Sequence, residues 1–571
     1  MKSYILTLSV GQIFGRAATP VIQPLTIETP DHVRSIYIAR LPIDLTRAKD
    51  VNPAAVRMDG GALYPAQFVT ALIEHSRADV IYFPSTPLHD SADLRLTDVF
   101  LAHRDRIRFI PVSEFSTLPD EANLVLLSTG WRLEDLLVAR SAFRGQPRPA
   151  CALTHSLCSP SLLNTLLLLR LAPATEYDAL VCSSCAGKQA LEAMFTMISE
   201  RCDAAGAKLP PCALALPVIP LGIDIGENHE LARAGAQNVC GILYFGRLAT
   251  TSKSDLRPLL LAFSLLLREG LQATLTIAGD DTQSNLGPML AEFAAALGCK
   301  HHVAILSNPT SLDKEKLFAA ADIFVSPSNS LQEQFGLSLL EAMRAGLPVV
   351  AANWSGHRDI VVHGETGFLV DTVFPAIAEQ PEETVGPMTS DHIADATSID
   401  IGQLMSYLRM LIADPALRTR FGIAATRRVR DLYSWKRVIG MHDDLWDSLR
   451  DRAARTMVNP ERRAIHFESW TPHKLFGGFA THSWRYSTRV ISAPLQQSVV
   501  ETICRSLAGE RASNGLPESL LDRVRAEGEC TVKRLVEESG ESVHEVVHCL
   551  GLLAKHGLIT VATECRPTTA D

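Results

Sequence analysis

Two glutamates, Glu333 and Glu341, flank the start of a predicted helix in the second half of the chain. The helix begins around Phe335-Gly336-Leu337, where the first turn leaves backbone N–H groups unpaired and the helix dipole favours a phosphate. Glycine at this point lets a phosphate approach the backbone closely. A carboxylate one turn further along can accept two ribose hydroxyls, as acidic residues do in dinucleotide-binding folds. The spacing alone would equally suit a surface helix with two solvated glutamates.

Two cations, Arg247 and Lys253, follow the predicted strand 242–245. At the carboxyl end of a parallel strand they could hold a diphosphate and offset leaving-group charge without a metal ion. Arg and Lys are usually exposed, so by themselves the two residues would equally be surface charges. The sequence has no Asp-x-Asp pair, and the adjacent Asp280-Asp281 lack a third carboxylate partner. We therefore expect no metal site.

A histidine, His155, follows the predicted strand 151–153 in the first half of the chain. A lone histidine near apolar residues is most often a histidine of the core. Its position directly after a strand favours a ligand contact instead, because open α/β sheets bind ligands beyond the carboxyl ends of their strands.

The elements around these residues alternate between apolar strands and amphipathic helices, which predicts parallel sheets covered by helices on both faces. In the first 235 residues the expected strands are 35–39, 80–83, 108–112, 124–127, 151–153, 179–182 and 218–220, and the helices include 65–75 and 188–198. From residue 241 the expected strands are 242–245, 273–278, 303–306, 323–326 and 348–352, and the helices are 255–268, 285–297, 313–320 and 336–344. We expect domains at 1–235, 236–455 and 456–571, with a surface insertion at 372–399.

The segment 328–370 reads SNSLQEQFGLSLLEAMRAGLPVVAANWSGHRDIVVHGETGFLV. It resembles the E-x7-E signature of the family 4 retaining glycosyltransferases, whose GT-B fold has two doubly wound Rossmann-like domains facing a cleft. Val218–Asp224, Gly241–Leu248 and Ala413–Trp435 are similar to further landmarks of that family, in the expected order. The fold class implied is α/β of the GT-B type, with a mainly helical C-terminal module added.

The resemblance implies a retaining, hexosyltransferase-like enzyme that moves a sugar from a nucleotide diphosphate sugar to a hydroxyl acceptor, without metal or cofactor. Departure of the diphosphate builds negative charge, which Arg247 and Lys253 would offset. Glu333 and His155 would orient the sugar as its oxocarbenium character develops. The acceptor is left open between a glycan, a lipid-linked sugar, a peptide and a small molecule. The donor-binding residues implied are Arg247, Lys253, Glu333, Phe335, Gly336, Leu337 and Glu341.

Two other classes of protein share parts of this pattern. A nucleotide-sugar epimerase or a phosphorylase has the same two-domain architecture, although a phosphorylase would need a site for pyridoxal phosphate or free phosphate. A non-catalytic scaffold would keep a silent cleft and recruit partners through its C-terminal module. A silent cleft has no chemical need of two cations and two glutamates together, which favours the enzyme.

The last 115 residues or so change character. An arm crowded with aromatic residues, 466–486, precedes a pattern of helices and a strand that resembles a winged helix-turn-helix. Glu541 and Glu545 lie at the expected recognition helix, where phosphate would repel them, so we expect no nucleic-acid binding. Aromatic residues suit protein interfaces, so we expect 456–571 to contact a second copy of the chain or another protein. The expected elements are 495–507, 531–538, 542–556 and 557–561.

Composition sets the remaining bounds. The chain has 571 residues, with 54 Lys and Arg against 63 Asp and Glu, and its net charge of -9 predicts no general attraction to nucleic acid or anionic lipid. No apolar run reaches the roughly 18 residues of a membrane span, and Tyr4–Val10 is better interpreted as a strand than as a signal peptide. Cys182 and Cys185 form a CxxC without a second pair, so we expect no zinc. Scattered cysteines predict reduced thiols in a cytoplasmic protein.

Overall fold

The fold is seen in a computed structural model. It describes residues 34–40, 60–85, 99–111, 118, 124–140, 148–159, 161–226, 239–375, 390–456, 484–494, 500 and 516–562. The chain separates into two compact units, Met1–Phe467 and Glu468–Asp571. The expected N-terminal strand Tyr4–Val10, nearly all of the expected helix 495–507 and most of the aromatic arm 466–486 lie outside the described residues.

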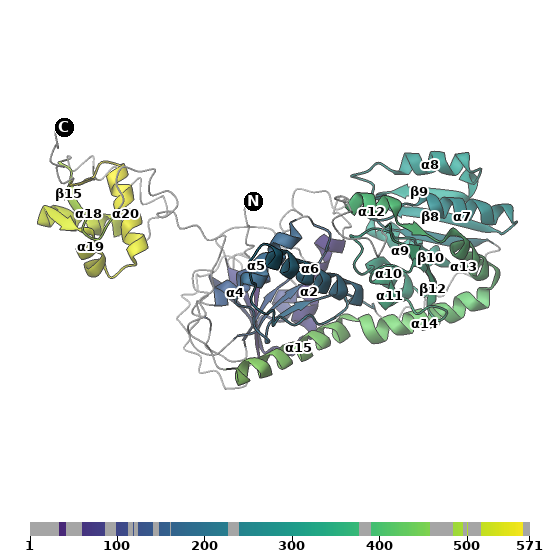
Figure 1. The fold of residues 1–571 in the computed structure, drawn as a ribbon, viewed down its shortest axis with the longest axis horizontal. Helices are drawn as coiled ribbons and strands as arrows, with labels where there is room; N and C mark the ends of the chain where they lie inside the picture. Colours follow the sequence, from purple (N-terminus) through teal and green to yellow (C-terminus); the bar gives the residue numbers. More distant parts are fainter. Residues whose placement is uncertain are drawn as a thin grey trace. The chain divides into compact units, whose positions relative to one another are not determined.

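The first unit contains a six-stranded parallel sheet in the order β3-β2-β1-β4-β5-β6. The helices that accompany this sheet are labelled in Figure 1. Every residue of the last three strands is buried, as expected for a parallel sheet covered on both faces. The strands are β1 Ser35–Arg40, β2 Val80–Ser85, β3 Ile107–Pro111, β4 Leu124–Ser128, β5 Ala150–Leu153 and β6 Ala179–Val181. The helices are α2 Gly60–His75, α4 Leu133–Arg140, α5 Leu162–Leu171 and α6 Cys185–Ala204.

The expected strand 218–220 is the one prediction for this sheet that is wrong. Val218 makes only an isolated bridge, with Cys182. The backbone amide of Cys182 donates to the carbonyl of Pro217, and the amide of Ile219 donates to the carbonyl of Cys182. Because Pro217 lacks an N–H group, the ladder beside β6 is interrupted there and does not become a strand.

The second sheet of this unit has the order β12-β11-β10-β7-β8-β9. The strands and helices expected from residue 241 onward are confirmed, with small shifts at their ends. The strands are β7 Cys240–Phe245, β8 Ala273–Gly279, β9 Val303–Ser307, β10 Ile323–Ser326, β11 Val349–Ala352 and β12 Gly367–Val370. The helices are α7 Arg257–Arg268, α8 Gly287–Ala296, η4 Lys300–His302, α9 Ser311–Ala320, α10 Leu337–Arg344 and α11 His357–Ile360.

Both sheets share one topology. Numbered along the chain within each sheet, their strands follow the order 3-2-1-4-5-6 of doubly wound nucleotide-binding folds. The order reverses between β1 and β4 in the first sheet and between β7 and β10 in the second. Such a reversal opens a crevice at the carboxyl ends of the two strands, and that is where ligands bind. The expected α/β fold with two Rossmann-like domains is therefore confirmed.

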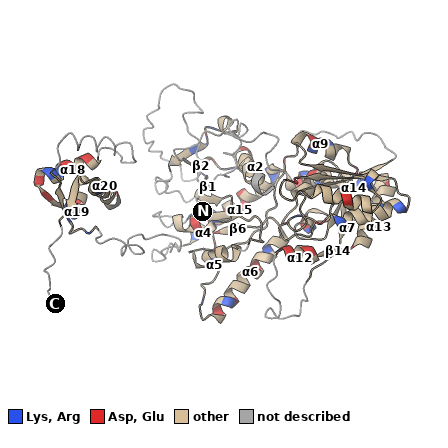
Figure 2. Cartoon of the chain, turned by 90° about the horizontal axis from the view of Figure 1, so that it is seen from above, with Lys and Arg blue, Asp and Glu red and all other residues tan. Residues whose placement is uncertain are grey.

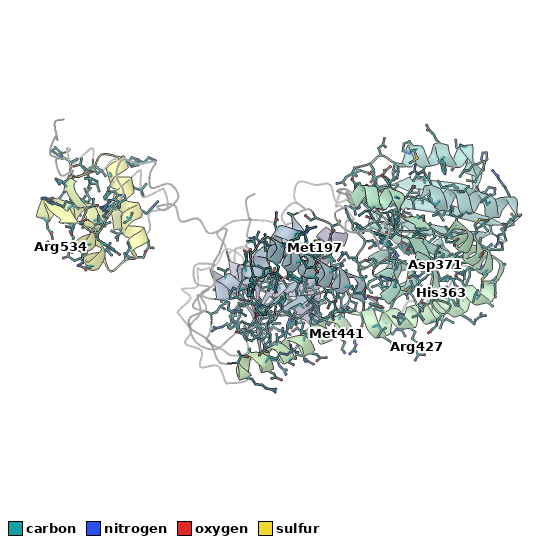
Figure 3. The ribbon with its side chains drawn as sticks, viewed as in Figure 1. Met197, His363, Asp371, Arg427, Met441 and Arg534 are labelled. Atoms are coloured by element: carbon teal, nitrogen blue, oxygen red, sulfur yellow. The ribbon has the colours of Figure 1, made fainter. Side chains whose placement is uncertain are left out.

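The chain after β12 forms a small hairpin and three long helices. Strand β13, Thr372–Val373, pairs antiparallel with β14, Ser398–Ile399, so the described ends of the expected insertion meet. Helix α12, Ser390–Ala396, precedes β14. Asp371, labelled in Figure 3, accepts a hydrogen bond of 2.8 Å from Nε2 of Gln403 beside this hairpin. The helices that follow are α13 Ile401–Ala413, α14 Pro415–Tyr433 and α15 Trp435–Arg455.

The last helix, α15, belongs in sequence to the second domain but packs against the first. The ring of Trp435 lies 5.5 Å from that of Tyr64 in α2. Further along, the carboxylate of Asp443 accepts a hydrogen bond of 2.7 Å from Oγ of Ser76 and one of 2.8 Å from the backbone amide of Arg77. The helix therefore joins the two sheets into one compact unit.

The second unit has its own core, formed by Val490, Leu535 and Leu550 among others. Strand β15, Arg489–Ser492, is central and pairs antiparallel with β16, Glu529–Thr531, and β17, Ile559–Val561. Helices α19, Val532–Ser539, and α20, Val543–Lys555, confirm two expected helices. Helix α18, Leu516–Glu527, and strands β15 and β16 were not expected.

The described helices carry charges of both signs and differ from membrane-spanning helices. Basic and acidic residues are interspersed along them (Figure 2). Among the described residues, no helix combines the length and the apolar character that crossing a membrane requires.

Candidate active site

Lys253 and Glu333 meet where the strand order of the second sheet reverses. Lys253 lies on the loop after β7 and Glu333 on the loop after β10, and these two strands are neighbours in the sheet. Their side chains form an ion pair between Nζ and Oε2, with only 17% and 9% of the side chains exposed. The topological reversal thus brings a predicted phosphate-binding cation onto a predicted catalytic carboxylate.

The charge of Glu333 is set by two opposing effects. Burial by itself would raise the pKa of this carboxyl, because an apolar environment disfavours the charged form. The ammonium of Lys253 has the opposite effect, with smaller contributions from His357 and the backbone amide of Phe335. The pKa of Glu333 therefore lies below its ordinary value, and the group is a buried carboxylate at neutral pH.

His357, at the first position of α11, is a neighbour of Glu333 that the sequence analysis did not single out. Its side chain is fully buried, and Nε2 lies 3.9 Å from Oε2 of Glu333. Burial lowers the pKa of His357 to about 4, so the imidazole is neutral at pH 7. The Glu333 carboxylate is thus bordered by one cation and one neutral ring.

The start of α10 depends on glycine. Gly336 has φ of 117°, a conformation that side chains rarely adopt. A Cβ atom there would also lie 2.9 Å from Cδ2 of His357. Glycine is therefore required by both the turn and the buried imidazole. Phe335 and Leu337 lie on either side of it at the helix start, and a role of these three residues in phosphate binding stays a prediction.

Arg247 lies on the same loop as Lys253. Its Nη2 donates a hydrogen bond of 3.2 Å to the carbonyl of Ser252, and its own carbonyl accepts one of 3.2 Å from the hydroxyl of Tyr244. Within the described residues no carboxylate forms an ion pair with Arg247. Hydrogen bonds within the loop therefore hold Arg247. Of the two cations on this loop, Lys253 pairs with Glu333, whereas Arg247 pairs with no acidic side chain among the described residues.

Glu341 lies in the second turn of α10, and it also has a lysine partner. Nζ of Lys314 in α9 lies 2.5 Å from Oε1 of Glu341, and the two side chains are 25% and 24% exposed. The sequence predicts helix 313–320 but indicates no role for Lys314. Its contact with Glu341 depends on how two helices pack, which no motif in the sequence indicates.

On the side of the first sheet, His155 follows β5 and contacts the loop after β4. Nε2 of His155 lies 2.7 Å from the carbonyl oxygen of Thr129. Burial lowers the pKa of His155, which favours the neutral ring, and in that ring Nε2 carries the proton that is donated to Thr129. This hydrogen bond fixes the tautomer and the plane of the ring.

Two contacts join the loops of the two sheets near these residues. The side-chain amide of Gln334, the neighbour of Glu333, is assigned from its surroundings with the nitrogen facing the carbonyl of His155 at 3.0 Å and the oxygen facing the amide of Leu157 at 3.2 Å. In this orientation it donates to His155 and accepts from Leu157. The backbone amide of Cys185, at the start of α6, donates to Oδ2 of Asp359 at 2.6 Å. The loop that carries Glu333 is therefore linked through the side chain of Gln334 to the backbone of the loop that carries His155. Sequence patterns cannot show this link, because it joins two separate domains.

Metal ligands do not gather in this region. Among the described residues, no group of three or more His, Cys, Asp or Glu side chains is arranged to hold a metal ion.

Comparisons with known proteins bear on the second sheet. Residues 237–380 match the family described as "Glycosyl transferases group 1". The chain is 30% identical over 168 residues to the D-inositol 3-phosphate glycosyltransferase of Segniliparus rotundus, covering 28% of this chain and 36% of that protein. It is 28% identical over 228 residues to the glycogen synthase of Mycobacterium tuberculosis, covering 40% and 47%. The chain thus spans less than half the length of each relative, and its second sheet is related to the group 1 glycosyltransferases.

Among solved structures, the chain is similar to a glycosyltransferase from Rickettsia africae, with 14% identity and a TM-score of 0.47, covering 73% of this chain and 98% of that one. It is also similar to a sucrose-phosphate synthase from Thermosynechococcus elongatus, with 16% identity and a TM-score of 0.45, covering 73% and 100%.

Proposed function

We propose that this chain transfers a sugar from a nucleotide diphosphate sugar to a hydroxyl acceptor, with retention of configuration at the anomeric carbon. The observation that carries the proposal is the buried Lys253–Glu333 pair at the strand-order reversal of the second sheet. This reversal is where doubly wound folds bind nucleotides, and it lies within the segment related to group 1 glycosyltransferases.

The diphosphate is the part of the donor that the cations of the β7 loop would hold. Negative charge develops on it as the bond to the sugar breaks, and Arg247, Lys253 and the amino end of α10 would stabilise that charge. A diphosphate competes with Glu333 for Lys253. Donor binding would therefore loosen the ion pair and leave the Glu333 carboxylate facing the sugar.

The sugar would then lie between the loops of the two sheets. Glu333 approaches it from the second sheet and His155 from the first, and the Gln334 bridge holds these two loops together. A carboxylate beside the anomeric centre stabilises positive charge as the oxocarbenium develops. Because Nε2 of the neutral His155 ring donates to Thr129, Nδ1 can accept one hydrogen bond from a sugar hydroxyl.

The remaining parts of the proposal concern partners. Cations of the chain itself meet the leaving-group charge, so the proposed reaction uses no metal ion and no cofactor. The acceptor is a hydroxyl of a glycan, a lipid-linked sugar, a peptide or a small molecule. We propose a cytoplasmic protein whose residues 456–571 contact a second copy or another protein and do not bind nucleic acid.

A panel of donors tests the proposal. UDP-, GDP-, ADP- and dTDP-sugars are each incubated with the protein in the presence of a chelator, and nucleotide release is measured together with calorimetric binding of the free nucleotides. Release from one donor, with the anomeric configuration retained in the product, supports the proposal. Absence of both release and nucleotide binding contradicts it and favours a scaffold that acts through the C-terminal unit.

A further inference from the structure

We propose that Lys314 is a positioning residue for the donor. It holds the carboxylate of Glu341 in the orientation that accepts the ribose hydroxyls. The inference rests on the proposed function, because it takes Glu341 as the group that binds ribose.

The contact itself joins two helices that no sequence motif connects. Nζ of Lys314 in α9 lies 2.5 Å from Oε1 of Glu341 in α10, and each side chain is about three-quarters buried. Within the described residues, Oε2 of Glu341 has no hydrogen-bond partner. A carboxylate accepts up to about four hydrogen bonds. One lysine on Oε1 therefore fixes the plane of the group and leaves acceptor positions on both oxygens for a vicinal diol.

Lys314 is itself held in place by packing. Its ammonium lies 5.3 Å from the centre of the Phe245 ring, within the range of a cation–π contact. Phe245 is the last residue of β7, and its ring lies 5.5 Å from that of Phe318, one turn beyond Lys314 in α9. Thr310 caps the same helix through reciprocal hydrogen bonds with Asp313. The lysine therefore extends from a fixed helix, over a packed aromatic cluster, to Glu341.

An ordinary surface ion pair would not serve this purpose. Arg409 and Glu269 form one at 2.8 Å, but both side chains are more than 40% exposed and no ring packs against them in the described structure. Such pairs contribute little, because water screens the charges and both side chains stay mobile. A glutamate that is ordered before the ligand arrives avoids the entropy cost of immobilisation during binding. Removing its lysine should therefore weaken nucleotide binding about tenfold.

The test separates ribose recognition from the other contacts of the nucleotide. UDP, GDP and ADP are each titrated by calorimetry, together with their 2′,3′-dideoxy analogues, into the wild-type chain and the variants Lys314→Met, Lys314→Arg and Glu341→Gln. For the nucleotide that binds, we expect Lys314→Met to weaken binding about tenfold and to leave the affinity for its dideoxy analogue nearly unchanged. Lys314→Arg should restore part of the loss. The double variant Lys314→Met/Glu341→Gln should bind no more weakly than Glu341→Gln alone.

Equal loss for the ribose and dideoxy nucleotides would overturn the proposal, because it would mean a direct contact of Lys314 with base or phosphate, or damage to the fold. Unchanged affinity for both would overturn it as well. Lys314→Gln, compared by melting temperature, replaces Lys314→Met if that variant does not fold. A wild-type chain that binds none of the three nucleotides contradicts the proposed function together with this inference, whereas normal wild-type binding without the ribose-specific loss contradicts this inference alone.

Discussion

The two glutamates of the E-x7-E segment each pair with a lysine, yet their surroundings differ. Glu333 and Lys253 are buried on loops at the strand-order reversal, and the fully buried ring of His357 lies beside them. Glu341 and Lys314 lie on neighbouring helices, and about a quarter of each side chain is exposed. Charges removed from water interact strongly with any charge nearby, whereas exposed pairs are screened. Burial would suit the Lys253–Glu333 pair to chemistry. The partial exposure of the Lys314–Glu341 pair would suit it to holding a ligand.

The buried pair should show the largest effects. Lys253→Met leaves the Glu333 carboxylate buried without its cation, which should cost about 3–5 kcal/mol of stability. Loss of a charge that faces the leaving group should lower turnover by about 10²- to 10³-fold. Urea denaturation and nucleotide release measure the two effects.

A double variant is the control for this pair. Lys253→Met/Glu333→Gln removes both charges, so it should recover most of the lost stability but none of the activity. A double variant as unstable as Lys253→Met alone would show that the cost comes from packing and not from the unpaired charge.

His357 should determine a pH dependence of stability. Its pKa falls from 6.5 to about 4 on folding, so the unfolded chain binds the proton more tightly. The contribution of His357 to the free energy of unfolding is therefore fully present above pH 6.5 and declines as the pH falls towards 4. His357→Leu should remove roughly 3 kcal/mol of the decline between these pH values. The wild-type chain and the variant are compared by urea denaturation at steps of pH, and parallel profiles would contradict the assignment.

Removing the Gln334 contact between the two domains should have a smaller effect on activity. Gln334→Ala removes the hydrogen bonds to the carbonyl of His155 and the amide of Leu157. Each neutral hydrogen bond contributes about 1 kcal/mol, so we expect the KM for donor to rise several-fold with a smaller change in kcat. Steady-state kinetics measure both values. Glu341→Gln is the contrasting variant, because it should change nucleotide affinity without affecting the contact between the domains.

A surface ion pair far from this chemistry should show the smallest effect. Arg427 lies on α14 (Figure 3), with 83% of its side chain exposed, and its guanidinium is 3.6 Å from the carboxylate of Asp431. Arg427→Ala should leave the melting temperature and nucleotide release unchanged, since exposed pairs are weak. A clear loss of activity in this variant would mean that burial does not separate the functional pairs from the others.

The sequence predicts the second sheet well, because its strands are short apolar runs bounded by turn residues and its helices repeat between them. The first sheet is predicted less completely: Pro217 lacks an N–H group and interrupts the hydrogen bonds between the expected strand 218–220 and β6, although the residues are apolar. In the C-terminal unit, β15 and β16 are too short and too mixed in polarity to give a period. Their pairing becomes evident only from the residues that they pack against.

Some residues of the candidate site can likewise be predicted from the sequence, and others cannot. Lys253 and Glu333 follow strands whose order can be inferred from the doubly wound pattern, so their meeting is predictable. His357, Lys314 and Gln334 reach the site through packing between separate helices and loops. No spacing in the sequence indicates such contacts. The sequence therefore indicates the residues proposed to do the chemistry better than it indicates the residues that contact them.

The central claim is that Glu333, paired with Lys253, carries the sugar-transfer chemistry. The most direct measurement is nucleotide release from the preferred donor by Glu333→Gln, with calorimetry of the free nucleotide on the same preparation. We expect the variant to bind the nucleotide with near wild-type affinity but to release it from the sugar at least about 100-fold more slowly. Release at the wild-type rate, with the fold intact, would contradict the account.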